Sequence, residues 1–293
     1  MKRNETRRTT LSSATALVEA FAGAVAAHPE RVAVTDAERS WTYRELDETA
    51  ARLAAALRER SAEPGRPVGV LLDRSAWTVA AALAVVRTGS SYVPLDPETP
   101  RARLELIVED AEPAAVITSR SLAGQVPDGV AALYVDDPLP EPAAEEEPGV
   151  AIGRDTRAYI IFTSGTTGRP KGVQVSHGNV LSLLAACEEG YDFGPEDVWT
   201  LVHSFAFDVS VFEMWGALLH GGRLVVVPAK TAKDPAAFRR LLRDEQVTVL
   251  SQTPTAFQPL WAEDIRHADL LPLRWVVFGG EALHFSDLRA WVG

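Results

Sequence analysis

Hydrophobic positions along the 293-residue chain alternate between two patterns. Short, nearly continuous runs of Val, Ile and Leu are separated by longer Ala- and Leu-rich stretches with helical periodicity. Strands that are covered on both faces need such continuous runs, and βαβ units produce the alternation. The pattern predicts an α/β fold with strands at Val68–Leu72, Ala115–Thr118, Ala158–Phe162, Leu224–Val227, Val247–Ser251 and Trp275–Phe278.

Two of the stretches between strands carry signals for the start of a helix. Thr42 and Glu45 have the spacing of a capping box, and the apolar residues that follow them lie on one helical face. Asp234 followed by Pro235 matches a helix cap and the first helical position. We therefore predict helices that begin directly after Thr42 and after Asp234.

Composition and charge exclude several classes of protein. The chain has 29 Lys and Arg against 40 Asp and Glu, a net charge of −11, so nucleic-acid and anionic membrane partners are not expected. The mainly apolar run Trp77–Val86 is about half of the ~20 residues that a membrane span needs, and it predicts a buried helix. A single cysteine, Cys187, and the lack of a signal-peptide core favour a cytoplasmic location. The Pro- and Glu-rich segment Pro138–Gly149 predicts an exposed loop.

The strand predicted at Ala158–Phe162 runs into the string Thr163-Ser-Gly-Thr-Thr-Gly-Arg-Pro-Lys171-Gly172. Its hydroxyl groups, glycines and single lysine offer many donors and little steric bulk to a polyphosphate. The string differs from a Walker A loop, because Lys171 does not follow Gly168 directly. By composition alone, an ordinary Gly- and Thr-rich turn is an alternative.

The whole string resembles the phosphate loop of the adenylate-forming superfamily, which includes acyl-CoA synthetases, luciferases and the adenylation domains of nonribosomal peptide synthetases. Trp41–Leu46 and Arg87–Asp96 resemble the first two core motifs of that family, and we interpret both as architectural. The resemblance continues through Gly172–Asn179 into a helix that is predicted to begin near His177. It implies ATP binding by Thr163, Ser164, Gly165, Thr166, Thr167, Gly168 and Lys171, with catalytic roles for Thr163 and Lys171.

The resemblance also implies a fold: the large N-terminal subdomain of an adenylate-forming enzyme, built from stacked βαβ-type sheets. It covers residues 17–293, after a flexible N-terminus at residues 1–16. The motifs expected after Gly293, and with them the small C-terminal subdomain, are not in the sequence, so we expect a fragment or a truncated gene. Because Met1 directly precedes the first family helix, we expect a stand-alone or loading enzyme.

Asp208 is the residue that bears most directly on the substrate. Apolar residues at helical spacing follow it, so it occupies the position of a helix cap, and capping is one role for its carboxylate. The string Phe207-Asp208-Val209-Ser210 also resembles the motif by which amino-acid-activating members of the family hold the substrate ammonium. A carboxylate in an aromatic, poorly hydrated setting is costly unless it meets a cation, which suits that second role.

Two later strings resemble the pocket wall and the adenine-contacting strand of the family. They are Ser251–Phe257 and Trp275–Ala282. Position by position, the resemblance implies a side-chain pocket lined by Val209, Phe212, Thr255, Val277 and Gly279, with Gly280 and Glu281 beside the adenine. Since none of the five pocket residues is charged, we expect a substrate with an uncharged, small to medium side chain.

The function implied is ATP- and Mg²⁺-dependent activation of an amino acid as aminoacyl-AMP, with release of pyrophosphate. The aminoacyl group then passes to the phosphopantetheine of a peptidyl carrier protein, in the synthesis of a nonribosomal peptide such as an antibiotic. An acyl- or aryl-CoA synthetase is one alternative, and a non-catalytic remnant that binds a nucleotide or a partner is another. The sequence offers no residue set that we assign to a metal.

We predict that residues 1–293 alone do not catalyse amino-acid-dependent pyrophosphate exchange. The family's magnesium glutamate, ribose aspartate and bridging lysine are not among the residues present, and loss of a single preorganised donor to a developing charge costs ~10²–10³ in rate. An exchange assay on the purified chain measures this directly. Robust exchange would contradict the family-based assignment of those three groups.

Overall fold

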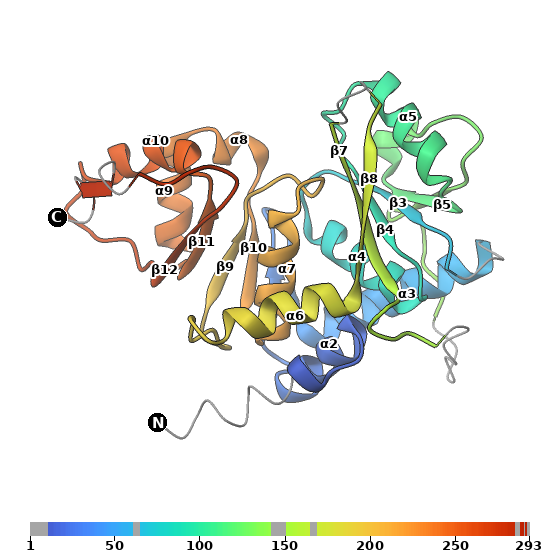
Figure 1. The fold of residues 1–293 in the computed structure, drawn as a ribbon, viewed down its shortest axis with the longest axis horizontal. Coiled ribbons are helices and arrows are strands. Elements are labelled where there is room, and N and C mark those ends of the chain that lie inside the picture. The colour runs from blue at the N-terminus through green and yellow to red at the C-terminus, as the bar shows by residue number, and fades with distance from the viewer. Residues whose placement is uncertain are drawn as a thin grey trace.

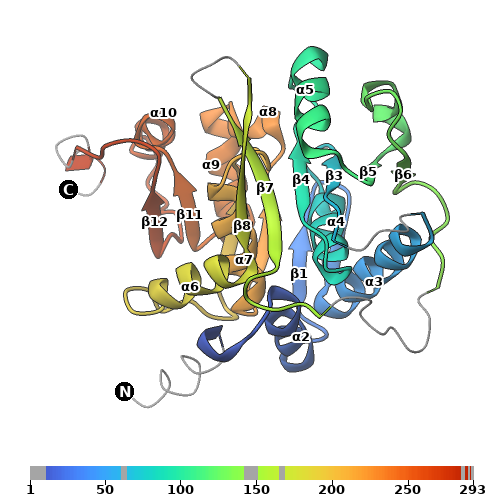
Figure 2. The same ribbon diagram turned by 45° about the vertical axis from the view of Figure 1, so that its right-hand side comes forward.

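Two six-stranded sheets form the framework of the computed structural model, which describes residues 11–60, 65–141, 151–164, 169–284, 288–289 and 291 (Figures 1 and 2). In spatial order, the first sheet contains β12 (Trp275–Phe278), β11 (Val249–Gln252), β9 (Val198–Leu201), β10 (Arg223–Val226), β1 (Val32–Thr35) and β2 (Ser40–Thr42). The second contains β6 (Ala132–Tyr134), β5 (Ala115–Thr118), β3 (Val68–Leu71), β4 (Tyr92–Leu95), β7 (Arg157–Thr163) and β8 (Lys171–Ser176).

Neighbouring strands in both sheets are parallel except at one edge of each, where β2 and β8 run antiparallel to β1 and β7. The α/β prediction is confirmed. β5 and β12 have the predicted bounds, and the other four predicted strands differ from the observed ones by one or two residues at an end. The six predicted strands do not include β1, β2, β4, β6, β8 and β9. The edge strand β8 has no apolar run, because it is polar and largely exposed.

Ten helical segments with both ends in the described part of the chain precede or connect the strands. They are α2 (Leu17–Ala27), α3 (Tyr43–Arg60), α4 (Ala76–Arg87), α5 (Arg101–Ala111), the 3-10 helix η1 (Arg120–Gln125), α6 (His177–Cys187), α7 (Val209–Leu219), α8 (Ala229–Ala232), α9 (Pro235–Asp244) and α10 (Pro254–Asp264). At the start of α3, the Thr42 N–H donates to Glu45 Oε2 over 2.8 Å and the Glu45 N–H donates to Thr42 Oγ1 over 3.2 Å. At the start of α9, Asp234 Oδ1 accepts from the N–H groups of Ala236 and Ala237. Both predicted helix starts are therefore confirmed.

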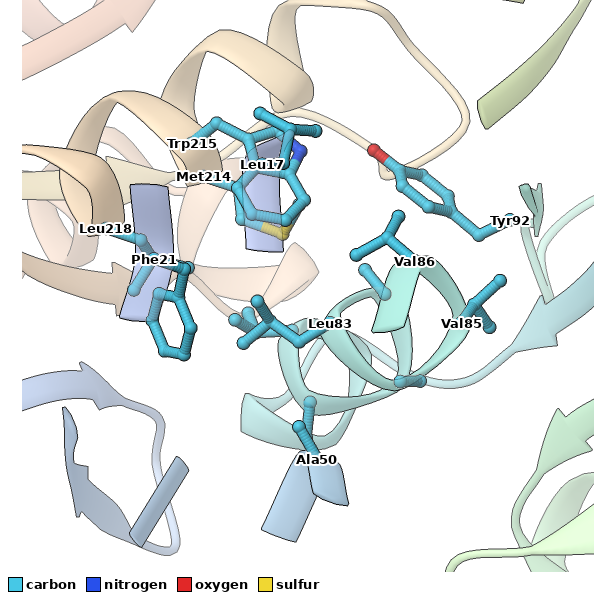
Figure 3. Close-up of a cluster of buried hydrophobic side chains, with 14 of the residues drawn as sticks. Leu17, Phe21, Ala50, Leu83, Val85, Val86, Tyr92, Met214, Trp215 and Leu218 are labelled. Atoms are coloured by element: carbon cyan, nitrogen blue, oxygen red, sulfur yellow. The ribbon is translucent and has the colours of Figure 1, made fainter. Parts of the chain in front are cut away.

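The helix α4 lies between the sheets and contacts β3 and β4 of one and β1 of the other. Every residue from Thr78 to Val86 is buried, so the predicted buried helix is confirmed. Figure 3 shows side chains of α2, α4 and α7 meeting around Phe21, Leu83 and Trp215. Burial of each such side chain contributes about 1.5–3 kcal/mol. Among the described helices, none is long and apolar enough to cross a membrane.

The packed part of the chain begins earlier than predicted. Leu11, Ala14 and Ala16 are buried, and Leu11 and Ala14 belong to the main hydrophobic core. The predicted boundary of a flexible N-terminus at residue 16 is therefore too late, because these small and apolar side chains complete the core around α2. Residues 1–10 and most of the predicted loop Pro138–Gly149 lie outside the described residues.

His177 begins α6, as predicted, and joins this helix to α2. Ser176 and Asn179 form a capping box at the helix start, and the Leu17 N–H donates to His177 Nδ1 over 3.1 Å. Burial lowers the pKa of His177 to about 4, so the imidazole is neutral at physiological pH. A histidine that accepts a backbone hydrogen bond in this way has a structural role.

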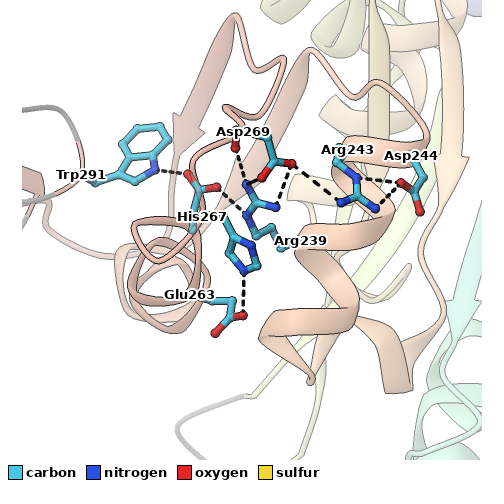
Figure 4. A network of polar contacts seen from close by, with 8 residues as sticks. Arg239, Arg243, Asp244, Glu263, His267, Asp269 and Trp291 are labelled. Atoms are coloured by element: carbon cyan, nitrogen blue, oxygen red, sulfur yellow. Dashed lines mark hydrogen bonds and ion pairs between the residues drawn. The ribbon is translucent and has the colours of Figure 1, made fainter.

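Helices α9 and α10, which cover the outer side of β11, are joined by a buried arginine (Figure 4). The Arg239 side chain is 2% exposed and its Nε lies 2.8 Å from Asp264 Oδ1. It also donates to the backbone carbonyl of Asp269. A second hydrogen bond, from Arg239 Nη1 to Asp269 Oδ2 over 3.4 Å, lowers the pKa of the Asp269 carboxyl group. Trp291 Nε1 donates to the other oxygen of Asp264 over 2.8 Å. The pairing satisfies a guanidinium that would be costly to bury alone.

We predict opposite effects of Gly→Ala substitutions in two helices. A Cβ at Gly216 in α7 would lie 2.8 Å from the Trp199 ring, whereas one at Gly23 in α2 meets nothing within 4 Å. Gly216→Ala should destabilise the fold by about 1–3 kcal/mol through overpacking, and Gly23→Ala should stabilise it by up to ~1 kcal/mol through helix propensity. Urea unfolding of the two variants measures both effects. A Gly216→Ala protein as stable as the wild type would show that Trp199 is not closely packed.

Candidate functional site

Asp208 occupies the N-cap position of α7, but its side chain makes no capping hydrogen bond. Its backbone is already helical, with φ −62° and ψ −28°, whereas a capping residue normally has extended backbone angles. The turn is closed instead by Ser210, whose Oγ donates to the Phe207 carbonyl oxygen over 2.6 Å. The Asp208 carboxylate is consequently exposed and available to a ligand. The expected poorly hydrated setting is not found, since Phe207 is itself 63% exposed.

The segment from His203 to Asp208 is held on two sides. His203 Nδ1 lies 2.8 Å from Oε1 of Glu213, a completely buried carboxyl group on α7. Burial raises the pKa of Glu213, and the hydrogen bond with His203 opposes that shift. On the other side, Ser204 Oγ donates to Asp96, which follows β4 of the second sheet. These contacts position the backbone that carries Asp208 relative to both sheets.

A cavity of about 520 Å³ lies beside the first turns of α7 and is called here the α7 cavity. It opens where β11 and β12 reach their carboxyl ends, the edge at which parallel sheets bind ligands. Asp208 is the only charged residue among the described residues that line it. The structure brings most of the predicted pocket residues together in its wall: Val209, Phe212, Val277 and Gly279, together with Gly280.

Thr255 is not among the described residues that line this cavity. It stands in the first turn of α10, is exposed, and donates its backbone N–H to Glu281 Oε2 over 3.0 Å. Hydrogen bonds from Thr255 lower the pKa of Glu281. The strand β11 instead supplies Ser251, which is 2% exposed, lines the cavity, and has an Oγ without a hydrogen-bond partner among the described residues. Sequence reasoning did not identify Ser251, although it begins the string that contains Thr255.

A second cavity of about 530 Å³ lies between the β7–β8 hairpin, α5 and the segment that precedes α7, and is called here the hairpin cavity. Its lining includes Arg103, Thr163 and Ser164. The two cavities share Tyr159, Val175 and Asp208. Burial, assisted by the negative charge of Asp208, raises the pKa of Tyr159 to about 12. Asp208 therefore stands where the two cavities adjoin.

The predicted phosphate loop connects the two strands of the hairpin. Thr163 at the end of β7 is the antiparallel partner of Lys171 at the start of β8. Both side chains are exposed, and Lys171 has no ion pair with any described residue. Gly165, Thr166, Thr167 and Gly168 lie outside the described residues. The observed part of the hairpin thus places one hydroxyl group and one ammonium group opposite each other at its open end.

Magnesium has no recognisable site in the described part of the chain. No group of three or more His, Cys, Asp or Glu side chains converges there in a way that could hold a metal ion. The donors at the hairpin are hydroxyl, ammonium and guanidinium groups, which suit phosphate oxygens and not a divalent cation.

Three parts of the site around Asp208 differ in the chemical group that each can bind. Its carboxylate can hold a cationic group, the α7 cavity can hold an uncharged group, and the hairpin cavity offers cationic and hydroxyl donors to an anion. A zwitterion with a neutral side chain, next to a phosphate, matches this arrangement.

Comparisons with known proteins identify relatives of this chain. The family model of the AMP-binding enzymes matches residues 21–293. A plipastatin synthase of Bacillus subtilis (strain 168) is 45% identical over 279 residues, covering 94% of this chain and 11% of the relative. Syringomycin synthase SyrB1 of Pseudomonas syringae pv. syringae is 44% identical over 283 residues, covering 94% of this chain and 45% of the relative. The chain thus spans less than half the length of these relatives.

Solved structures of nonribosomal peptide synthetases share the fold. FmoA3 with bound α-methyl-L-serine-AMP superposes with a TM-score of 0.87 and 28% identity, covering 99% of this chain and 33% of that one. The four-domain synthetase AB3403, bound to AMP and glycine, superposes with a TM-score of 0.85 and 28% identity, covering 97% of this chain and 21% of that one.

Proposed function

The chain belongs to the family of AMP-binding enzymes, and we propose that it forms the part of an adenylation enzyme that selects an amino acid and presents it to ATP. The product is an aminoacyl-AMP, and pyrophosphate is released. The observation that carries the proposal is the position of Asp208: an uncapped, exposed carboxylate between a cavity whose other described lining residues are uncharged and a cavity lined by Arg103, Thr163 and Ser164.

In this proposal Asp208 accepts charge-assisted hydrogen bonds from the α-ammonium of the substrate. The substrate side chain enters the α7 cavity among Val209, Phe212 and Val277, and the carboxylate of the substrate faces the hairpin cavity. Thr163, Ser164 and Lys171 bind the phosphates of ATP, and Gly280 and Glu281 flank the adenine. The loop residues Gly165, Thr166, Thr167 and Gly168 complete the phosphate site.

The reaction requires alignment and no protein nucleophile. A carboxylate oxygen of the amino acid attacks the α-phosphorus of ATP, the bond from that phosphorus to the oxygen bridging to the β-phosphate breaks, and pyrophosphate leaves with the bonding electrons. Asp208 fixes one end of the nucleophile, and Lys171 and Thr163 stabilise negative charge on the phosphates. Positioning and preorganised charge supply the acceleration.

Similar proteins support two parts of the proposal: the use of ATP and the transfer of the aminoacyl group to a carrier protein. FmoA3 has also been solved with AMPPNP, an ATP analogue, and its fold matches this chain with a TM-score of 0.84 and 28% identity. The peptide-synthetase relatives support transfer of the aminoacyl group to a phosphopantetheine-bearing peptidyl carrier protein. We include Mg²⁺ with ATP on the family resemblance alone, and assign none of its ligands to the described residues.

An acyl- or aryl-CoA synthetase is the second candidate, because it shares the phosphate loop. Its carboxylic acid substrates have no ammonium group, so the free carboxylate of Asp208 would face their neutral chains at an energetic cost. This favours the amino-acid assignment. A remnant that binds nucleotide without turnover would show no amino-acid-dependent pyrophosphate exchange.

We predict that Asp208→Asn abolishes selection of the amino acid and preserves use of ATP. The assay protein is a chimera in which residues 1–293 replace the matching segment of a peptide-synthetase relative. Loss of the charge-assisted bond should lower kcat/KM for the amino acid by about 10²-fold or more, while KM for ATP changes by less than about twofold. Amino-acid-dependent pyrophosphate exchange measures both. Asp110→Asn, an exposed carboxylate on α5, is the matched control. Unchanged exchange by the Asp208 variant would contradict the ammonium role.

We predict that the preferred amino acid has an uncharged side chain. A charged side chain in the α7 cavity loses its hydration without gaining a partner, so Asp, Glu, Lys and Arg should be disfavoured by about 100-fold or more. Ser251→Ala should reduce the preference for threonine over its isostere valine by about 10-fold, because Ser251 Oγ is the unpaired polar atom in the wall. A panel of amino acids in the exchange assay tests both statements. A charged amino acid ranked first would refute the assignment of the cavity.

A further inference from the structure

Arg103 is a guanidinium group without a partner in the wall of the hairpin cavity. It lies in the first turn of α5, is half-buried, and has no hydrogen bond or ion pair from its side chain to any residue that the structure describes. Other arginines near it are paired: Arg101 binds Glu105 over 2.8 Å, and Arg169 binds Glu109 over 2.8 Å. An arginine that is half-buried and unpaired, while its neighbours are paired, is positioned for a ligand and not for the fold.

The lining of the cavity identifies the chemistry of that ligand. Arg103 is the only Lys or Arg among the described lining residues, and it shares the wall with Thr163 and Ser164 at the end of β7. Asp96, an anion in the same lining, already accepts a hydrogen bond from Ser204. The planar fork of a guanidinium matches two phosphate oxygens, and flanking hydroxyl groups add donors to the same anion. Arg103, Thr163 and Ser164 therefore offer donors to a phosphate group, while Asp96 and Asp208 are the two carboxylates in the same lining.

We propose that Arg103 binds the β- and γ-phosphates of ATP and holds the pyrophosphate as it leaves, a role that rests on the proposed adenylation function. Asp208 lies in the same lining and makes no ion pair with Arg103. With the ammonium of the amino acid at Asp208, the carboxylate of the same molecule stays close to Asp208. The guanidinium of Arg103 on α5 then remains for the β- and γ-phosphates, which leave the α-phosphorus as pyrophosphate.

The test measures the affinity of the 293-residue chain for inorganic pyrophosphate, AMPPNP and AMP by titration calorimetry. Arg103→Ala should weaken binding of pyrophosphate and of AMPPNP by about 10- to 100-fold and leave binding of AMP within about twofold, because AMP lacks the phosphates assigned to Arg103. Arg103→Lys should recover part of the loss, since it keeps the charge and loses the fork. Arg101→Ala is the matched control: it removes the same charge from the same helix, outside the cavity lining.

Three results would overturn the proposal. One is unchanged affinity for pyrophosphate in Arg103→Ala. Another is an equal loss for AMP and AMPPNP, accompanied by a lower Tm, which would show a structural role. The third is a loss confined to 4′-phosphopantetheine, tested as a separate ligand, which would assign Arg103 to the carrier arm and not to ATP.

The outcomes also separate this proposal from the adenylation function. If the wild type binds AMPPNP and an amino acid and Arg103→Ala behaves identically, the adenylation proposal stands and the role of Arg103 fails. If the wild type binds pyrophosphate through Arg103 but binds neither an amino acid nor an adenine nucleotide, the phosphate site stands and adenylation fails. If the wild type binds no phosphate ligand, both are overturned.

Discussion

The free carboxylate of Asp208 at the start of α7 is the feature on which the proposed function depends. A carboxylate at this position normally caps the helix, and here the helical backbone of Asp208 and the hydroxyl group of Ser210 remove that role. Two contacts fix the segment before the helix: the buried Glu213 holds His203, and Asp96 holds Ser204. These polar contacts fix the segment that carries Asp208 and leave its carboxylate without an ion pair to any described residue.

Those contacts are possible because the two sheets share one interior. The helix α4 packs against strands of both, and α7 packs closely enough on β9 that Gly216 contacts the Trp199 ring. A closely packed core is rigid. It therefore fixes the position of the α7 cavity relative to the hairpin cavity. In the proposed function, the amino acid and the phosphates of ATP occupy these two cavities.

The sequence predicted the fold better than the site. Continuous apolar runs located β5 and β12 to the residue. β5 is buried at all four positions, as its run predicts, whereas β12 lies at the edge of its sheet and is half-buried. The strand β8 was not predicted, since its residues are polar and exposed. The string from Ser251 crosses from β11 into α10, so Ser251 lines the α7 cavity while Thr255, predicted for the pocket, stands in the first turn of the helix and bonds Glu281. Arg103 could not be recognised, because its lack of a partner among the described residues is a property of tertiary structure alone.

A crystal structure with a non-hydrolysable aminoacyl-adenylate analogue, an aminoacyl sulfamoyl adenosine, tests the central claim most directly. The account predicts that the ammonium nitrogen lies about 3 Å from a carboxylate oxygen of Asp208, with the amino-acid side chain in the α7 cavity between Val209 and Val277. A complex in which the ammonium is bound elsewhere, while Asp208 turns back to cap α7, would contradict it.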